Sequence, residues 1–246
     1  MSSKIQNKKM WGGRFDSNMA QSMVDLSFSL HFDAELIEED IQGSIAHCKG
    51  LVESKILSPS ELNTIQNALK AILKDYQSGV SLWNSSDEDI HMAVERVLTE
   101  RIDLGKKIHT GRSLHDQVAT DFKLYMRNRS YEILKALNAL KSTLLDLAKN
   151  HRSKLMPGYT HVQQAQPIYF SHYLLAFFFV LDRDTHRFFN FLDLHHELPL
   201  GSGAMAGSAF PYQRDLVAKE LGFKAPSHNS IDAISHRDMA LEFSSS

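Results

Sequence analysis

The stretch KKIHTGRSLHDQVATD, residues 106–121, forms one polar turn and then opens the longest helical pattern of the chain. After Gly111, no glycine or proline occurs until Pro157. A helix of about 35–40 residues would be about 50–60 Å long, because each residue adds about 1.5 Å. Such a helix is too long for a compact monomer of 246 residues and predicts an oligomeric bundle.

The apolar positions of this helix also predict a bundle. They alternate steps of four and three, the spacing of helices that pack nearly parallel: Ile133, Leu137, Leu140, Leu144 and Leu147. A second long helix is predicted from Pro167, at the favoured first helical position, to about Leu194. The polar stretch between the two helices, MPGYTHVQQAQP at residues 156–167, is expected to be a loop.

Three shorter helical patterns precede the turn, over residues 34–53, 59–78 and 86–105. The second has a strong start, with Ser58 as cap, proline next and glutamate at the third position. Nothing in the chain alternates convincingly with period two, the pattern of a half-buried strand. We therefore predict an all-α fold.

The predicted helices group into two domains. Residues 1–110 would form a small N-terminal helical domain, and residues 111–246 a long-helix bundle domain. Shorter helical patterns at 211–221 and 231–243 follow a glycine-rich segment, residues 198–207, within the second domain.

Composition excludes several classes of protein. A net charge of −2 gives no reason to expect a nucleic acid or an anionic membrane as partner. The single cysteine, Cys48, cannot form an internal disulfide, and the polar N-terminus lacks the apolar core of a signal peptide. The most apolar run, residues 168–181, is too short to span a bilayer and predicts a buried core helix. We expect a cytoplasmic protein.

Two polar clusters are candidate sites, each with an ordinary structural alternative. Arg112 and Ser113 directly before a helix are typical of an anion site, or of a tight connection with ordinary capping. His161 is suited to proton transfer, or is a loop histidine bonded to the backbone.

Three further motifs carry weaker predictions. His91 and Glu95 lie one helical turn apart, but a metal would need a third ligand that the sequence does not show, so a plain side-chain pair is expected. Residues 201–207 either cradle a carboxylate or form a loop with unusual backbone angles. The run 195–197, His-His-Glu, is expected to be a solvated helix end.

Together, residues 110–121 (TGRSLHDQVATD) and 156–167 (MPGYTHVQQAQP) closely resemble the first two of three signature regions of argininosuccinate lyase. That enzyme belongs to the fumarase/aspartase superfamily and is related to δ-crystallin. The likeness continues, in the same order along the chain, through MWGGRF (10–15), SFSLHFDAELIEEDIQGS (27–44), DEDIHMAVERVLTE (87–100), LPLGSGAMAG (198–207) and NSIDAISHRD (229–238).

The resemblance implies an activity and an assembly. The family cleaves argininosuccinate to fumarate and arginine, in arginine biosynthesis, by general acid–base elimination and without a cofactor. Its members are homotetramers whose long helices share a bundle and whose active sites draw on three subunits. Adenylosuccinate lyase, another enzyme that releases fumarate, is the more distant alternative.

The resemblance also implies site residues, with no metal ligand among them. Thr160 would bind the succinate carboxylate, His161 would take part in proton transfer, and Gln163 would shape the same pocket. Further residues match the family's substrate pocket: Ser29, Asp33, His91, Arg112, Ser113 and, at a changed position, His115.

Two departures from the family pattern bear on function. Leu114 and His115 stand where the family has arginine and asparagine, which removes a positive charge and replaces a substrate contact with a bulkier side chain. The third signature, a mobile loop with the catalytic serine, is not found before Ser246, so we expect exposed apolar faces such as residues 174–181 and severely impaired activity of the chain alone. The alternative is a truncated, catalytically impaired family member with a structural or assembly role.

Overall fold

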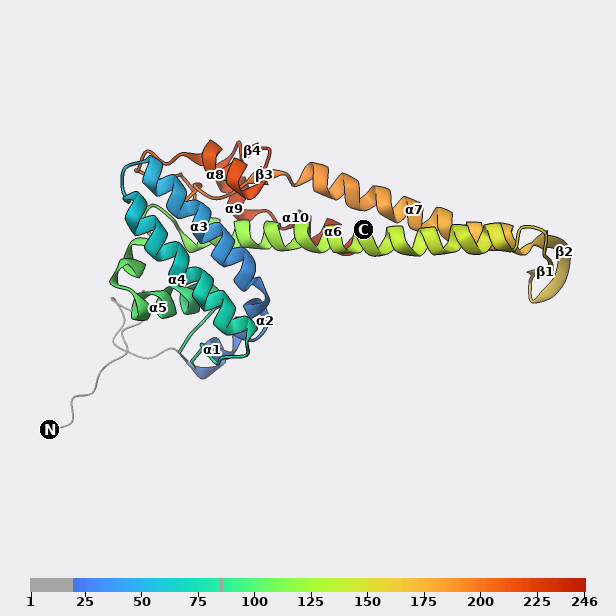
Figure 1. The fold of residues 1–246 in the computed structure, drawn as a ribbon, viewed down its shortest axis with the longest axis horizontal. Coiled ribbons are helices and arrows are strands. Elements are labelled where there is room, and N and C mark those ends of the chain that lie inside the picture. Colours follow the sequence, from blue (N-terminus) through green and yellow to red (C-terminus); the bar gives the residue numbers. More distant parts are fainter. Residues whose placement is uncertain (1–19, 85) are drawn as a thin grey trace.

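The computed structural model describes residues 20–84 and 86–246, and its described part is mainly helical, as predicted (Figure 1). A helical head holds the N-terminal elements, and a long pair of helices projects from it as an arm. The stretch MWGGRF, residues 10–15, lies outside the described residues.

The first part of the head, over the described residues 20–84 and 86–107, contains five α-helices and two 3-10 helices. In chain order these are α1 (Gln21–Ser27), α2 (Leu30–Asp33), η1 (Ala34–Leu36), α3 (Ile37–Glu53), α4 (Pro59–Gln77), α5 (Ile90–Arg101) and η2 (Asp103–Lys107). The predicted capping box of α4 is confirmed, because Ser58 Oγ accepts from the Glu61 N–H at 3.2 Å and Glu61 Oε2 accepts from the Ser58 N–H at 2.8 Å. Helix α5 begins later than expected, since Asp89 is its cap and accepts from the Met92 N–H at 2.7 Å.

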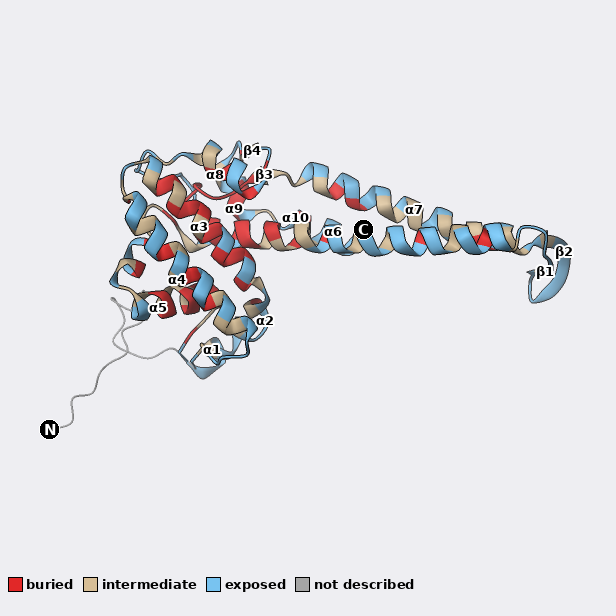
Figure 2. Cartoon of the chain, in the orientation of Figure 1, coloured by how far each residue is buried: buried red, intermediate tan, exposed pale blue. Residues whose placement is uncertain are grey.

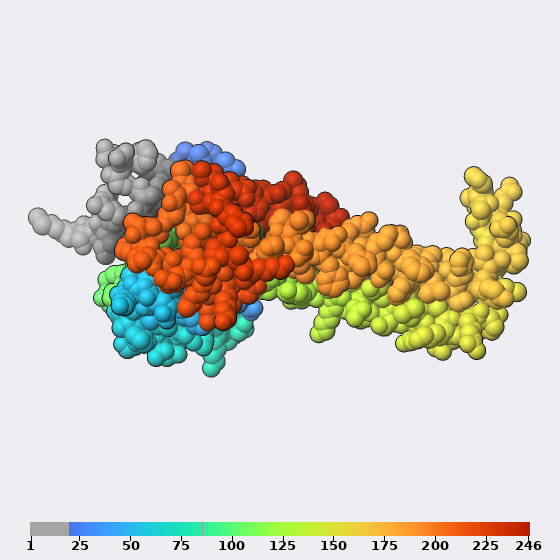
Figure 3. Space-filling model, turned by 90° about the horizontal axis from the view of Figure 1, so that it is seen from above, coloured from blue at the N-terminus to red at the C-terminus, as the bar shows by residue number. Residues whose placement is uncertain are grey.

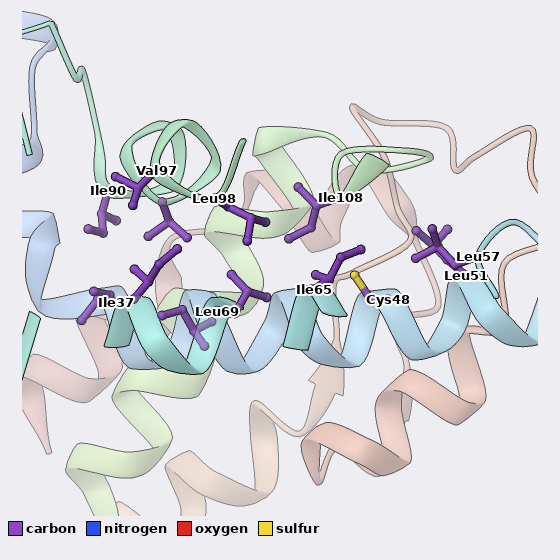
Figure 4. Close-up of a cluster of buried hydrophobic side chains, with 13 residues drawn as sticks. Ile37, Cys48, Leu51, Leu57, Ile65, Leu69, Ile90, Val97, Leu98 and Ile108 are labelled. Carbon is purple, nitrogen blue, oxygen red and sulfur yellow. The ribbon is translucent and has the colours of Figure 1, made fainter. Parts of the chain in front are cut away.

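The core of the head lies between α3, α4 and α5 (Figure 4). Leu51, Ile65, Leu69, Ile90 and Leu98 have no exposed surface there. Burying one such side chain stabilises the fold by about 1.5–3 kcal/mol before entropy is counted, so this cluster fixes how α3 and α5 face each other.

The arm is built from α6 (Leu114–Asn150) and α7 (Phe170–Leu194), which pack against each other. Helix α6 has 37 residues and is about 55 Å long, in agreement with the prediction. Figure 3 shows the arm extending from the head, with the segment between α6 and α7 standing out at its far end.

That segment is an antiparallel hairpin, not the expected loop. Strand β1 (Leu155–Thr160) pairs with β2 (Gln163–Tyr169), and Pro167, expected to begin a helix, lies opposite Pro157 in the ladder. His161 and Val162 form the two-residue turn with φ of 51° and 63°. The sequence did not predict the hairpin because both strands contain proline and are largely exposed, so no apolar–polar alternation marks them.

The chain then returns to the head, and its last helix, α10 (Asp238–Ser245), packs against α7 of the arm. The elements of this last part are β3 (Glu197–Leu198), α8 (Arg214–Leu221), β4 (Ala225–Pro226), α9 (Ser230–Ser235) and α10, and β3 pairs with β4 in parallel. Helix α8 packs against α3, where Val217 and Leu221 share a buried cluster with Ala46. The single helical pattern predicted over 231–243 is therefore wrong: it is divided between α9 and α10.

The arm is largely exposed (Figure 2). In the apolar run 168–181 only Leu174 is buried, whereas Phe177, Phe179 and Val180 are 47%, 57% and 46% exposed. The expectation of a buried core helix is wrong for this chain, because α7 packs on α6 alone along most of its length; the expectation of an exposed apolar face is confirmed. No helix in the described part of the chain is both long and apolar enough to cross a membrane.

Candidate active site

The turn at residues 110–113 joins the head to α6, and its polar groups are held by Asp116. Ser113 is the helix cap: its hydroxyl accepts from the His115 N–H at 3.3 Å, and its own N–H donates to Asp116 Oδ1 at 2.9 Å. Asp116 has no exposed surface. Ordinary capping, one of the two interpretations of this turn, is therefore present, and it uses donors that an anion site would need.

The glycine-rich segment closes on the same carboxylate. The N–H groups of Gly201 and Gly203 both donate to Asp116 Oδ2 at 2.8 Å, and both glycines have positive φ, 93° and 61°. Burial raises the pKa of Asp116 from its ordinary value, against the lowering effect of these backbone donors. The loop with unusual backbone angles is therefore observed, and its Gly201 and Gly203 donors are taken by a carboxylate of the chain itself.

His47 supports the turn from α3, a role that the sequence did not predict. Its imidazole contacts the Thr110 carbonyl oxygen at 3.0 Å through Nε2 and the Tyr212 hydroxyl at 2.8 Å through Nδ1. Burial, with the nearby charge of Arg112, holds the pKa of His47 well below its ordinary value. The neutral ring therefore donates from Nε2 and accepts at Nδ1. A lone histidine in a helix gives no sign of such partners in the sequence.

His91 lies in a buried cluster of charges from three helices. Its Nδ1 is 3.0 Å from Asp40 Oδ1 of α3 and 3.1 Å from Asp121 Oδ2 of α6. The expected pair of His91 with Glu95 is absent from the structure, because Glu95 instead binds His109 Nδ1 at 3.0 Å. A one-turn pair on a helix surface contributes only about 0.2–0.5 kcal/mol, which cannot compete with two carboxylates in a buried site.

The cluster holds its charges by mutual attraction. Burial would lower the pKa of His91, but its bonds to Asp121 and Asp40 outweigh burial and hold it well above the ordinary value. Burial and the neighbouring Asp40 raise the pKa of Asp121 to about 7. The pKa of Asp40 is lowered, because His91 and Arg112 outweigh its burial.

This cluster is a possible set of metal ligands, but it contains His91 without Glu95, so it is not the set considered from the sequence. Donor atoms of Asp40, His91 and Asp121 all lie within 4.8 Å of one another. One histidine nitrogen and two carboxylate oxygens are chemically suited to a divalent cation. A cation there would have to displace the proton from His91 Nδ1, and the nearby positive charge of Arg112 would repel it.

The other head residues connect to this cluster through short contacts. Ser29 Oγ donates to Asp33 Oδ2 at 2.5 Å, and Asp33 Oδ1 accepts from the Ile90 N–H at 3.1 Å, next to His91. Burial raises the pKa of Asp33 from its ordinary value. Arg112 is buried and donates from Nη1 to Ser44 Oγ at 2.8 Å, one turn of α3 beyond Asp40.

The predicted site residues fall into two separate sets. The head set comprises Ser29, Asp33, His91, Arg112, Ser113 and His115, of which His115 is exposed. The hairpin set comprises Thr160, His161 and Gln163, all exposed at the far end of the arm (Figure 1). Because α6 separates them by about 55 Å, one chain does not bring the two sets together.

A helical head joined to a long helix pair is also found in solved structures of lyases. A solved structure of an EDDS lyase variant with bound fumarate matches with a TM-score of 0.76 and 26% identity, over 89% of this chain and 43% of that one. A fumarate lyase of the δ-crystallin type from Brucella melitensis matches in fold, with a TM-score of 0.70 and 16% identity, over 95% of this chain and 55% of that one.

The chain belongs to the lyase family, whose model matches residues 13–246. It is similar to the argininosuccinate lyase of Acetivibrio thermocellus, with 47% identity over 237 residues, 96% of this chain and 52% of the relative. The argininosuccinate lyase of Nitratiruptor sp. is 46% identical over 95% of this chain and 51% of the relative. The resemblance found in the sequence is thereby confirmed, and the chain spans about half the length of the curated relatives it matches.

Proposed function

We propose that this chain carries the chemistry of argininosuccinate lyase, a carbon–nitrogen lyase that cleaves argininosuccinate to fumarate and L-arginine by general acid–base elimination. The observation that carries the proposal is the 47% identity to a protein of that name over 96% of this chain. Arginine biosynthesis, in the cytoplasm, is the corresponding process.

In this proposal the hairpin set acts on the succinate part of the substrate. His161 moves the proton, directly or through a water, Thr160 binds a carboxylate, and Gln163 shapes the pocket. The turn supports these roles, because His161 and Val162 hold the left-handed conformation, which is costly for side chains other than glycine. Strained residues that persist in a fold cluster at functional sites.

The head set binds the rest of the substrate in the same proposal. His91, Asp33 and Ser29 form one edge of the pocket, and Arg112, Ser113 and His115 form the other, at the start of α6. His115 is exposed, with its Nδ1 3.1 Å from Ser113 Oγ, so its side chain is available to a ligand.

The assembly that we propose is a homotetramer built on the arm, with residues 1–110 and 111–246 as the two domains. Exposed apolar side chains on both arm helices support it, Leu140 and Leu147 on α6 and Phe177 and Phe179 on α7. In such a bundle, the hairpin of one copy can lie against the head of another. That arrangement would unite the two residue sets that α6 holds apart.

The test is fumarate release from argininosuccinate by the purified chain, with the solution mass of the same sample and the change in melting temperature that argininosuccinate causes. Fumarate release by an oligomer supports the proposal. Binding of argininosuccinate without release of fumarate supports argininosuccinate as the ligand and contradicts catalysis by this chain.

A second candidate function is a structural or assembly role without catalysis. The observation that favours it is the changed pair Leu114 and His115 at the start of α6, where the family has arginine and asparagine. A folded oligomer that neither binds argininosuccinate nor releases fumarate would support this role and overturn the catalytic proposal.

A further inference from the structure

A cavity of about 120 Å³ lies between α6, α7 and the segment that follows α8. It is separate from the His91 cluster: Lys123, which lines it, is two positions beyond Asp121, and two positions turn a helix by about 200°. Apart from Tyr131, the ionisable residues that line it in the described part of the chain are all basic, namely Lys123, Arg127, His195, His196 and Lys224, and His195 Nε2 is paired with Glu242 Oε2 at 2.8 Å. Apolar side chains such as Phe191 and Met239 form the rest of the wall.

Lys123 is the unusual group in this cavity. It is only 7% exposed, and its Nζ donates to the Glu197 carbonyl oxygen at 3.1 Å. In the described part of the chain no carboxylate lies within ion-pairing distance of Nζ, although Glu197, Asp232 and Asp238 act on it from further away. Burial lowers its pKa. Because buried charges are normally paired, an ammonium group with one neutral acceptor has donors left for a ligand.

Arg127 extends the donor surface from the same helix. Its Nη1 donates to the Leu221 carbonyl oxygen at 2.7 Å, and its guanidinium lies over the Phe223 ring at 5.1 Å. These contacts hold the planar group in place along one wall of the cavity while leaving further N–H donors. Lys224, exposed at the rim, pairs with Asp193 at 2.6 Å, so the acid nearest to it is already neutralised.

We propose that this cavity binds a small oxyanion, either inorganic phosphate or a short dicarboxylate, with Lys123 Nζ and Arg127 as the main donors. The cavity of about 120 Å³ has room for such a ligand, since about 10–15 Å³ of this space is enough for one water. A charged acceptor would replace the missing partner of Lys123 with charge-assisted hydrogen bonds, which are about twice as strong as neutral ones. The site is independent of the proposed lyase function.

The test is binding of inorganic phosphate and, separately, of succinate to the full chain, by calorimetry and by thermal unfolding at ionic strength matched with chloride. We expect saturable binding of at least one of them below about 10 mM and a matching rise in melting temperature. The two ligands distinguish an inorganic from an organic oxyanion as the occupant. No saturable binding of either would overturn the proposal.

Lys123→Met is the decisive variant, because methionine keeps the length of the side chain and removes the charge. It should melt at or above the wild-type temperature without added anion, since an unpaired buried charge is lost, and its affinity should fall at least about tenfold. Lys135→Met, at an exposed position of the same helix, is the matched control and should bind like wild type. Unchanged affinity in Lys123→Met would refute the assignment.

Lys224→Gln keeps the proposal testable if Lys123→Met does not fold. This substitution is at the exposed rim, outside the apolar wall, and should fold normally. We expect it to weaken oxyanion binding severalfold by removing one cationic group from the entrance. Equal affinity in this variant and wild type would count against an anion entering at this rim.

Discussion

Replacing Asp116 by asparagine should loosen the connection between the turn at the start of α6 and the glycine-rich segment. The carboxylate accepts three backbone N–H bonds, from Ser113 at 2.9 Å and from Gly201 and Gly203 at 2.8 Å each. Asparagine has the same shape but keeps only one acceptor oxygen. Whichever way the amide turns, its NH₂ group faces at least one N–H donor.

The expected cost follows from these contacts. A hydrogen bond to a charged group contributes about 1.5–3 kcal/mol, and a buried donor left without an acceptor costs about 1–3 kcal/mol. If the amide keeps its oxygen toward the two glycines, only the Ser113 bond is lost. The gain from no longer burying a charge offsets part of the loss, since burial raises the pKa of Asp116. We expect the free energy of unfolding to fall by about 2–4 kcal/mol.

Urea unfolding followed by helical circular dichroism measures this change. Asp146→Asn is the matched control: Asp146 lies on the same helix, its side chain is 72% exposed, and its stability change should be within about 0.5 kcal/mol of zero. Amide exchange at Gly201 and Gly203 should accelerate in Asp116→Asn and not in the control. A stability loss below about 0.5 kcal/mol in Asp116→Asn, with unchanged exchange at the glycines, would refute the reasoning.

Three further changes test other parts of the fold. The pKa of His91 is raised in the folded state, so the extra stability of wild type relative to His91→Asn should be largest below about pH 6.5 and should decline as the pH rises through the folded pKa of His91. Urea unfolding from about pH 6 to about pH 10 measures this stability difference, and a difference that grows with pH contradicts the prediction. Val162→Gly should stabilise the hairpin by about 1 kcal/mol, because glycine tolerates a φ of 63°, and amide exchange in the hairpin should slow; faster exchange would argue against a left-handed turn. Ser58→Ala should lower the free energy of unfolding by about 1 kcal/mol by removing the cap of α4, whereas an unchanged urea midpoint would mean that the capping box contributes nothing.

The sequence predicted those parts of the fold whose causes are local. Helix α6 follows from the absence of glycine and proline between Gly111 and Pro157, and α4 begins at the cap that Ser58 and its neighbours specify. The hairpin was missed because its ladder depends on pairing across a turn, and neither strand buries one face.

The candidate site divides in the same way, into local features that the sequence predicted and contacts between distant segments that it did not predict. The residue types of the head set were identifiable in the sequence, but their partners come from distant segments. His91 binds Asp40 and Asp121, which lie 51 and 30 positions away, so a pattern within one helix pointed to Glu95 instead. Such pairings are decided by how α3, α5 and α6 pack, and no spacing rule within a single helix contains that information.

The charges of the head also explain which proton there is easiest to move. The charge of Arg112 favours the ionised form of Asp40, Asp116 and Asp121, but burial outweighs it at Asp116 and Asp121, whose pKa values are raised. Burial, together with the neighbouring charge of Asp40, raises the pKa of Asp121 to about 7, so this carboxyl group exchanges its proton near neutral pH. An anionic group that binds beside Arg112 would offset its charge and raise the pKa of Asp121 further. Binding of an anionic substrate at the head should therefore be accompanied by proton uptake near neutral pH, and Asp121→Asn should abolish that uptake while leaving the other charges in place.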